Sequence, residues 1–213
     1  MNKLIISIDG PAGSGKERIA KYIAKKYKLY HLDSGILYRR LASFLIKDNI
    51  KINNPIQIKK FINSIDKISS RNHSKLRKQV VSNVSSKIAV LPFVRKFINK
   101  QQRIIVNNKL KIFKGCVVDG RDIGSKVFKE AKIKLFIDVA VNIRAKRRHK
   151  QLIDLGEKTI YGQILEEIKL RDRLDKNRKN SPLVVPKGAF ILDNSGNFKK
   201  TKLNIKKILN KIK

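Results

Sequence analysis

The chain has 213 residues, and 41% of them are hydrophobic, which is enough for one folded domain with a full core and too much for a disordered chain. Its 51 Lys and Arg residues outnumber its 16 Asp and Glu residues, and the formal net charge of +35 should attract nucleotides and other polyanions. The single cysteine, Cys116, excludes an internal disulfide, and no apolar stretch is long enough to cross a bilayer. We expect a cytoplasmic protein with one domain over residues 1–213.

Short apolar runs alternate with longer helical patterns along the chain. This alternation predicts βαβ units and an α/β fold, with a parallel sheet flanked by helices. The expected strands cover residues 3–8, 117–119, 133–139 and 189–192. The expected helices cover residues 16–27, 36–47, 75–88, 93–107, 141–154, 160–176 and 199–211. Residues 47–75 have the weakest pattern, and we expect a small helical excursion from the core there.

A Gly-rich turn follows the first expected strand and opens the next helix. Its glycines let backbone N–H groups curl around a phosphate, and the helix start adds free N–H groups and a partial positive charge. Lys16 is placed to reach the terminal phosphates of a nucleoside triphosphate. The sequence therefore predicts a P-loop and an ATP site. The expected ATP-binding residues are Gly10, Pro11, Ala12, Gly13, Ser14, Gly15, Lys16, Glu17 and Arg18.

Five further motifs occur in order along nearly the whole chain. They are His31-Leu32-Asp33-Ser34-Gly35 with Tyr38-Arg39, Val117-Val118-Asp119-Gly120-Arg121-Asp122-Ile123-Gly124, Arg144-Ala145-Lys146-Arg147-Arg148, the run from Ile168 to Arg178, and Ser181-Pro182-Leu183. Together they resemble the bacterial cytidylate kinases, which are P-loop nucleoside-monophosphate kinases. The resemblance implies transfer of the γ-phosphoryl of ATP to CMP or dCMP, giving CDP or dCDP and ADP. It also implies a small helical lobe for the acceptor nucleotide at about residues 34–110, and a lid with its flanking helices at about 144–180.

The acceptor site is expected around an arginine and a carboxylate, because cytosine presents an amine donor beside a ring-nitrogen acceptor and a carbonyl acceptor. Arg121 and Asp122, adjacent after a strand, supply such a pair, although a surface ion pair is the alternative. Ser34 can add a hydroxyl to the same edge, and Arg39 is placed to meet the monophosphate.

The resemblance adds further site residues. It implies that Ser86 and Arg103 line the acceptor site, that Arg171 and Arg178 meet phosphate, and that Asp175 meets a sugar hydroxyl. Without the resemblance, the charges on helix 160–176 would indicate an ordinary solvated face. Lys16, Arg147 and Arg148 are the expected catalytic residues, because cations in a lid stabilise the transferring phosphoryl group.

The phosphate loop departs from the usual pattern directly after its lysine. A Ser or Thr is expected there, or one place later in nucleoside-monophosphate kinases, where it helps to hold Mg²⁺. Glu17 and Arg18 carry no hydroxyl. We expect Mg²⁺ to be bound mainly through the ATP phosphates, with no dedicated protein metal site and with Asp119 either near the ion or purely structural. Arg18 is expected to contact phosphate, and Glu17 to point away from it.

Several alternatives remain open at this stage. Glu17 and Arg18 are also compatible with a catalytically impaired nucleotide-binding relative. The net charge is compatible with a basic nucleic-acid-binding protein on a P-loop scaffold, but the lysines are spread along the chain and aromatic content is only 7%. We expect nucleic acid to bind only through non-specific charge attraction. The expected partners are ATP and CMP or dCMP, with no membrane association, and the expected state is a monomer. Residues 47–75 are shorter than the corresponding insert of the resembling enzymes and have no hairpin pattern, which implies looser base discrimination.

Overall fold

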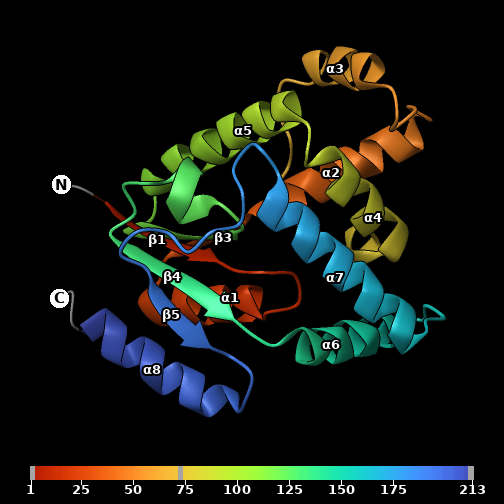
Figure 1. The fold of residues 1–213 in the computed structure, drawn as a ribbon. Coiled ribbons are helices and arrows are strands. Elements are labelled where there is room, and N and C mark those ends of the chain that lie inside the picture. The colour runs from red at the N-terminus through yellow and green to blue at the C-terminus, as the bar shows by residue number, and fades with distance from the viewer. Residues whose placement is uncertain (1–2, 72–73, 211–213) are drawn as a thin grey trace.

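The computed structural model describes residues 3–71 and 74–210. Its centre is one parallel sheet with the strand order β2-β3-β1-β4-β5 (Figure 1). The strands are β1 (Leu4–Asp9), β2 (Tyr30–Asp33), β3 (Gly115–Gly120), β4 (Ile133–Asp138) and β5 (Phe190–Asp193). The expected parallel sheet flanked by helices is confirmed, and β2 is a strand that the sequence pattern did not predict.

Helices cover both faces of the sheet. The α-helices are α1 (Lys16–Tyr27), α2 (Ser34–Lys47), α3 (Pro55–Asn63), α4 (Gln79–Ile88), α5 (Pro92–Leu110), α6 (Val141–Asp154), α7 (Tyr161–Asn177) and α8 (Phe198–Asn210). A short 3₁₀ turn, η1 (Ser74–Arg77), precedes α4, and a π-helical turn, η2 (Ile123–Val127), follows β3. Within the ranges that the structure describes, no helix has the length and apolarity needed to cross a membrane.

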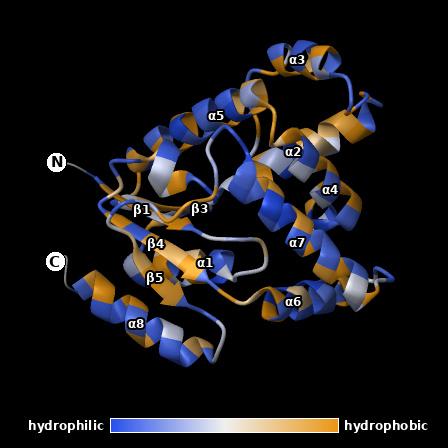
Figure 2. Ribbon diagram, in the orientation of Figure 1, coloured by the Kyte–Doolittle hydropathy of each residue, from blue (hydrophilic) through white to orange (hydrophobic). Residues whose placement is uncertain are grey.

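Two apolar layers sandwich the sheet, because neighbouring side chains on a strand point to opposite faces. Ile6 and Ile8 of β1 pack with α1 and α8 on one face. Cys116 and Val118 of β3 pack with Val106 of α5 and with η2 on the other. Figure 2 shows the strands as largely hydrophobic, as expected for a parallel sheet covered on both faces. Because helices cover both faces, ligands in such folds bind at the edge formed by the carboxyl ends of the strands.

Helices α2 to α5, which cover most of the expected acceptor lobe, share their own hydrophobic core. Leu41 of α2, Ile58 of α3, Val81 of α4 and Val94 of α5 are all buried in one cluster. Helix α3 lies within the weakly patterned segment 47–75, where a helical excursion was expected. It begins where the side chain of Asn54 accepts from two backbone N–H groups, each at 3.1 Å.

Helices α6 and α7 form an antiparallel pair held by their own small apolar cluster. In Figure 1, α7 runs from the open edge of the sheet past α4 to the outer end of α6. The pair corresponds to the expected lid region, and it lies opposite the acceptor lobe across the carboxyl edge of the sheet.

Candidate active site

The phosphate loop connects β1 to α1 and depends on glycine for its shape. Gly13 and Gly15 have φ angles of 74° and 82°, in the left-handed region. A Cβ on Gly13 would lie 3.0 Å from the Cβ and carbonyl oxygen of Arg144, so both conformation and space exclude a side chain there. The hydroxyl of Ser14 is buried and makes no hydrogen bond to any residue that the structure describes. The loop is therefore built as a cradle of main-chain groups.

Side chains from distant parts of the chain hold this cradle in place by donating hydrogen bonds to its carbonyl oxygens. Asn194, after β5, donates from Nδ2 to the carbonyl oxygen of Ser14 at 2.8 Å. Arg144 of α6 donates to the carbonyl oxygen of Ala12 at 3.1 Å and is itself paired with Asp172 at 2.6 Å. The sequence did not single out Arg144 for this anchoring role, because its partners are distant in the chain.

Lys16 is buried and folds back onto the loop, where Nζ donates to the carbonyl oxygen of Pro11 at 2.9 Å. Burial, together with the positive charge of Arg121, holds the pKa of this ammonium group well below its usual value. A buried cation that lacks sufficient negative charge is stabilised by an anionic ligand. The expected role of Lys16 at the terminal phosphates fits this environment.

Glu17 and Arg18, which follow the loop lysine, each contact a neighbouring part of the structure. Glu17 faces the acceptor lobe, where its carboxylate pairs with Arg77 at 2.6 Å, and it also pairs with Lys21 at 2.8 Å. Arg18 turns toward α8 and stacks over the ring of Phe198, with 4.0 Å between guanidinium carbon and ring centroid. The contact of Arg18 with phosphate, and the orientation of Glu17 away from it, remain predictions.

Carboxylates gather where β2 and β3 end. Asp33 and Asp119 are register partners on these two strands, and Nε2 of His31 lies 2.6 Å from Asp119 Oδ1. Burial and the negative charge of Asp119 raise the pKa of Asp33. Burial lowers the pKa of His31, but the hydrogen bond to Asp119 and its charge outweigh this effect and raise it overall. This pair of carboxylates acts electrostatically on Lys16 and so lies at the phosphate end of the site.

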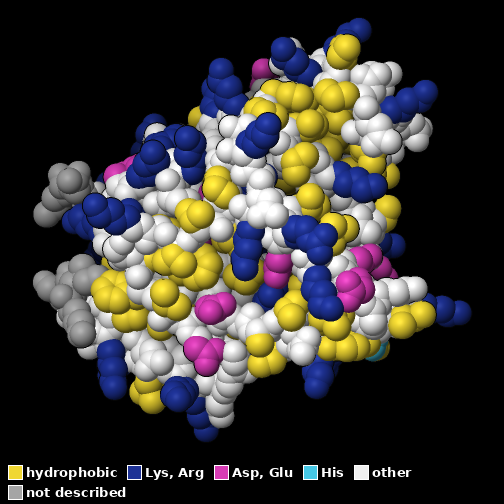
Figure 3. Space-filling view, in the orientation of Figure 1, with side chains coloured by type: hydrophobic (Ala, Val, Ile, Leu, Met, Phe, Trp, Pro, Cys, Tyr) yellow, Lys and Arg dark blue, Asp and Glu magenta, His cyan; other side chains and the backbone are white. Residues whose placement is uncertain are grey.

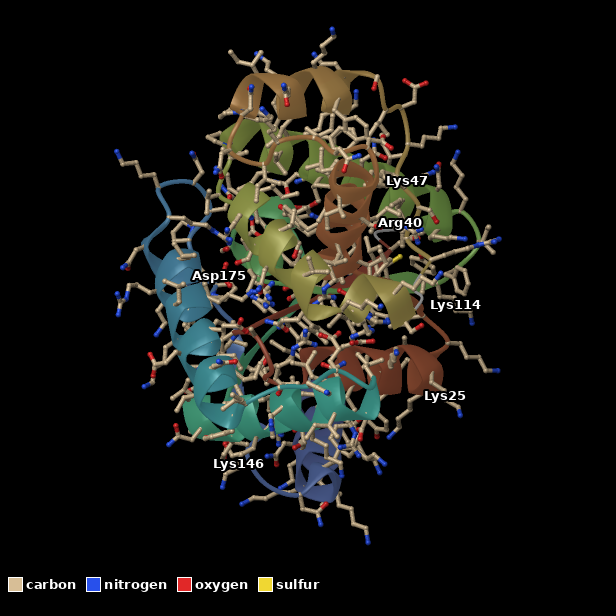
Figure 4. All side chains as sticks on the ribbon, turned by 90° about the vertical axis from the view of Figure 1, so that its right-hand side faces the viewer. Lys25, Arg40, Lys47, Lys114, Lys146 and Asp175 are labelled. Carbon is tan, nitrogen blue, oxygen red and sulfur yellow. The ribbon has the colours of Figure 1, made fainter. Side chains whose placement is uncertain are left out.

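A cluster of arginines faces these carboxylates from the acceptor lobe and α7. Burial, followed by the charge of Arg121, lowers the pKa of Arg171 to about 9. Burial also lowers the pKa of Arg39. The negative charge of Asp33 opposes this shift, and the positive charge of Arg121 adds to it. Asp175 lies between Arg121 and Arg178, with both N–O distances at 3.0 Å. Figure 4 places Asp175 on α7 at the edge of a concentration of side-chain nitrogens. Close guanidinium groups with too few carboxylates form an anion site.

Asp122 and its neighbours form a buried cluster of charged side chains. Asp122 Oδ2 lies 2.6 Å from Nη2 of Arg95, and Oδ1 lies 3.9 Å from Nη2 of Arg178. The guanidinium of Arg95 also lies over the ring of Tyr38, 5.7 Å from its centroid. Ser34 is buried against Gly120, where an added Cβ would lie 2.5 Å from Ser34 Oγ. The structure thus brings Asp122 and Arg178 together, adds Arg95, which the sequence did not single out, and places Ser34 against Gly120, two residues before Asp122.

Arg103, which was expected to line the acceptor site, lies away from Asp122. It is eight residues beyond Arg95 on α5, which corresponds to about 12 Å along a helix. Its guanidinium donates to the carbonyl oxygen of Val127 and pairs with Glu130 at 3.3 Å, with the side chain 49% exposed. Arg103 is therefore outside the Asp122 cluster, and Arg95 is the arginine of this helix that reaches it.

On α4, the serine that contacts another site residue is Ser82. Its hydroxyl accepts from Arg171 Nη1 at 3.1 Å, and Ser82 and Ser85 are both buried. Ser86 is only partly buried. The expected contribution of Ser86 to the acceptor site remains a prediction.

The two expected lid arginines diverge to opposite sides of the site. Arg147 donates to the carbonyl oxygen of Asn194 at 2.7 Å, and its Nη1 would lie 3.8 Å from a Cβ on Gly15, so it lies beside the phosphate loop. Arg148 donates to Gln79 Oε1 at 2.7 Å, on the acceptor side. Burial, followed by the charge of Arg39, lowers the pKa of Arg148 to about 10. Together they flank the space between the two phosphate sites.

A main-chain phosphate cradle facing a cluster of arginines, at the carboxyl edge of a parallel sheet, defines a P-loop phosphotransferase. The family model for cytidylate kinase matches residues 6–213. A cytidylate kinase from Bartonella henselae is 38% identical over 195 residues, covering 92% of this chain and 88% of the relative. One from Fusobacterium nucleatum is 36% identical over 219 residues, covering 99% and 95%. The chain belongs to the cytidylate kinase family.

Similarity to solved structures supports the fold. The crystal structure of TT1252 from Thermus thermophilus gives a TM-score of 0.52 at 14% identity and covers 100% of both chains. An uncharacterized protein from Eubacterium ventriosum gives 0.51 at 16% identity, covering 97% and 98%. At these identities the likeness shows the shared architecture alone.

Proposed function

We propose that this protein transfers the γ-phosphoryl group of ATP to the phosphate of CMP or dCMP, giving ADP and CDP or dCDP. The observation that carries the proposal is the pairing of two anion sites. One is the phosphate loop with Lys16, and the other is the arginine cluster that ends at Asp122. The cytidylate kinase relatives support the choice of acceptor.

Catalysis in this arrangement consists of positioning and charge stabilisation. The acceptor phosphate is already an anion, so no general base is needed. Lys16 at the loop and Arg148 at the acceptor side place positive charge around the phosphoryl group during transfer. Arg147, beside the loop, is placed to contribute on the ATP side. Because Lys16 and Arg148 are largely desolvated, their interactions with phosphate are stronger than in water.

Mg²⁺ would neutralise phosphate oxygens of ATP when bound. The site fits a hard cation, because Asp33 and Asp119 place two carboxylates at adjacent strand ends beside Lys16. The two carboxylates are close enough for the charge of Asp119 to raise the pKa of Asp33. Among the residues that the structure describes, no three acidic, His or Cys side chains are grouped to hold a metal. The ATP phosphates would therefore supply most ligands, with these two carboxylates acting directly or through water.

Asp122 would accept a hydrogen bond from the cytosine amine, and Arg95 and Arg121 would donate to acceptors on the base or phosphate. Arg95, 2.6 Å from this carboxylate, supplies the opposite charge beside it in a buried ion pair. Asp175, held between Arg121 and Arg178, is placed for a sugar hydroxyl.

A coupled assay of ADP release with CMP, dCMP, UMP and AMP tests the proposal. We expect turnover with CMP or dCMP and much lower kcat/KM with AMP, whose ring presents a different pattern of donors and acceptors. Comparable kcat/KM for all four acceptors would contradict recognition of cytosine by Asp122. The absence of turnover with any of them would contradict the proposed activity.

A further inference from the structure

The short segment from Arg77 to Gln79 joins three parts of the molecule. Arg77 Nη2 pairs with Glu17 Oε1 of the phosphate-loop helix at 2.6 Å. Arg148 of the lid region donates to the carbonyl oxygen of Arg77 at 3.2 Å and to Gln79 Oε1 at 2.7 Å. Glu157, between α6 and α7, accepts from the backbone N–H of Gln79 at 3.2 Å. The ATP side, the acceptor lobe and the lid therefore meet at these residues.

The guanidinium of Arg77 lies between the phosphate-loop helix and Asp33, close to Arg39. Arg77 Nη2 lies 3.7 Å from Asp33 Oδ2, and Arg39 Nη1 lies 4.0 Å from the same oxygen. The two arginines therefore bracket one carboxylate, and Asp33 in turn acts on Lys16. Arg77 extends the arginine cluster toward the phosphate loop.

Glu17 supplies the negative charge that keeps Arg77 there. The side chains of Arg77 and Glu17 are 17% and 27% exposed, so the pair is partly desolvated and stronger than a surface pair. Without Glu17, Arg77 would share Asp33 with Arg39, and the charges of Arg39 and Arg148 would repel it. The other partner of Glu17, Lys21, is 61% exposed and faces solvent on α1.

We propose that Glu17 is a positioning residue that holds Arg77 beside Arg39, so that Arg77 binds the acceptor phosphate on the side nearest the phosphate loop. The inference rests on the proposed function and adds one phosphate-binding arginine to it. It also gives a role to an acidic residue that directly follows the loop lysine. Glu17 does not touch substrate and acts through Arg77.

A double-mutant cycle over E17Q and R77Q tests this role. K21Q is the matched control, because it removes the other, solvent-facing partner of the same carboxylate. We expect E17Q and R77Q each to lower kcat/KM for CMP by roughly three- to thirtyfold. The double variant should be about as impaired as R77Q alone, because the effects of residues in direct contact are not additive. K21Q should stay near the native value. R77K should recover part of the loss, since it keeps the charge.

Several outcomes would overturn the proposal: additive losses in the double variant, an equal loss in K21Q, or a gain in kcat/KM for CMP in E17Q. A lower melting temperature in E17Q with unchanged CMP kinetics would show that the pair of Glu17 and Arg77 stabilises the fold only. If the native protein does not phosphorylate CMP, the proposed function fails independently. In that case calorimetry with inorganic phosphate decides the positioning role: weaker binding in E17Q and R77Q but not K21Q supports it, and unchanged binding rejects it.

Discussion

The phosphate loop is anchored through its own main-chain carbonyl oxygens, whereas the acceptor site depends on pairs of charged side chains. Ala12 and Ser14 are anchored by their carbonyl oxygens, and Lys16 also binds a carbonyl oxygen of the loop. In the acceptor site, Asp122 and Asp175 are held by arginines from three separate segments. A site built from backbone groups depends on its glycines and on the few side chains, such as those of Arg144 and Asn194, that anchor its carbonyl oxygens. A site built from buried ion pairs responds to each substitution, because removing one partner leaves the other charge uncompensated.

Replacing Lys16 by Met should have the largest effect on catalysis. Removing a cation from the transferring phosphoryl group should lower kcat by roughly 10²- to 10³-fold, by analogy with the loss of a single charge-stabilising donor. CMP affinity should change little, and the free energy of unfolding should not fall, because burial already disfavours the ammonium form of Lys16. Steady-state kinetics, calorimetry with CMP and denaturant unfolding check these three points. A matching loss of CMP affinity would show that the two sites are not separable.

Substitutions of Asp122 should affect the acceptor side alone. Asp122→Ala leaves the cytosine amine without an acceptor, so kcat/KM for CMP should fall by about five- to 150-fold, corresponding to ~1–3 kcal/mol. The KM for ATP should be spared. Asp122→Asn serves as the control, because it keeps one acceptor oxygen and should lose less. Equal impairment with ATP and CMP would mean that Asp122 supports the fold rather than the base.

Asp9 connects the strand before the phosphate loop to the turn after Asp122, and the pH dependence of stability tests this connection. Its two carboxylate oxygens accept from the backbone N–H groups of Ile123 and Gly124 at 2.7 and 2.8 Å, linking β1 to the turn after Asp122. Burial raises its pKa to about 6, although these hydrogen bonds oppose the shift. Because the folded-state pKa lies above the unfolded value of about 4, the stabilising contribution of Asp9 is fully present below that value and is lost as pH rises through about 6.

We therefore expect the native protein to lose about 1 kcal/mol more stability than Asp9→Asn between pH 5 and pH 7.5. Denaturant unfolding at the two pH values measures this difference. His31, whose pKa is also raised, is present in both proteins, so its contribution cancels in the comparison. Parallel pH profiles for the two proteins would argue against the raised pKa of Asp9.

The smallest expected effect is that of Arg18→Ala. Loss of the contact with Phe198 should cost ~0.5–1 kcal/mol of stability, in the range of an exposed cation–π interaction. Any increase in KM for ATP should remain well below the effect of Lys16→Met. Thermal unfolding and ATP titration of the variant test this. A tenfold rise in KM for ATP with unchanged stability would instead support the contact between Arg18 and phosphate that the sequence pattern suggested.

Local patterns predicted the phosphate loop and most helices, and for α1 and α6 the expected bounds match the observed ones. These elements are set by short-range features such as glycine spacing and helical periodicity. Strand β2 was missed because its four residues, Tyr30–Asp33, include two polar side chains and are too short for an alternating pattern. Its pairing with β3 comes from tertiary contacts that periodicity does not report.

The acceptor site was less accessible to sequence reasoning. Motif order brought out Arg121, Asp122 and Asp175, and the structure joins them through shared arginines. Arg95 was missed because α5 carries several basic residues, and only the three-dimensional direction of each shows which one reaches Asp122. The pairing of Glu17 with Arg77 spans 60 positions in the chain and gives no local signal. The scattered cations in Figure 3 show why charge counts alone do not separate site arginines from solvated ones.

The position of β1 at the centre of the sheet also has a consequence for synthesis of the chain. Leu4 pairs with Gly115 and Ile6 with Ile133, so β1 leaves the ribosome long before β3 and β4, its two neighbours in the sheet, have been made. The core of the acceptor lobe, by contrast, runs from Leu37 to Ile98 and contains mostly local helical contacts, which form quickly. We expect this lobe to become compact during translation, with the sheet closing around β1 only after β3 and β4 emerge.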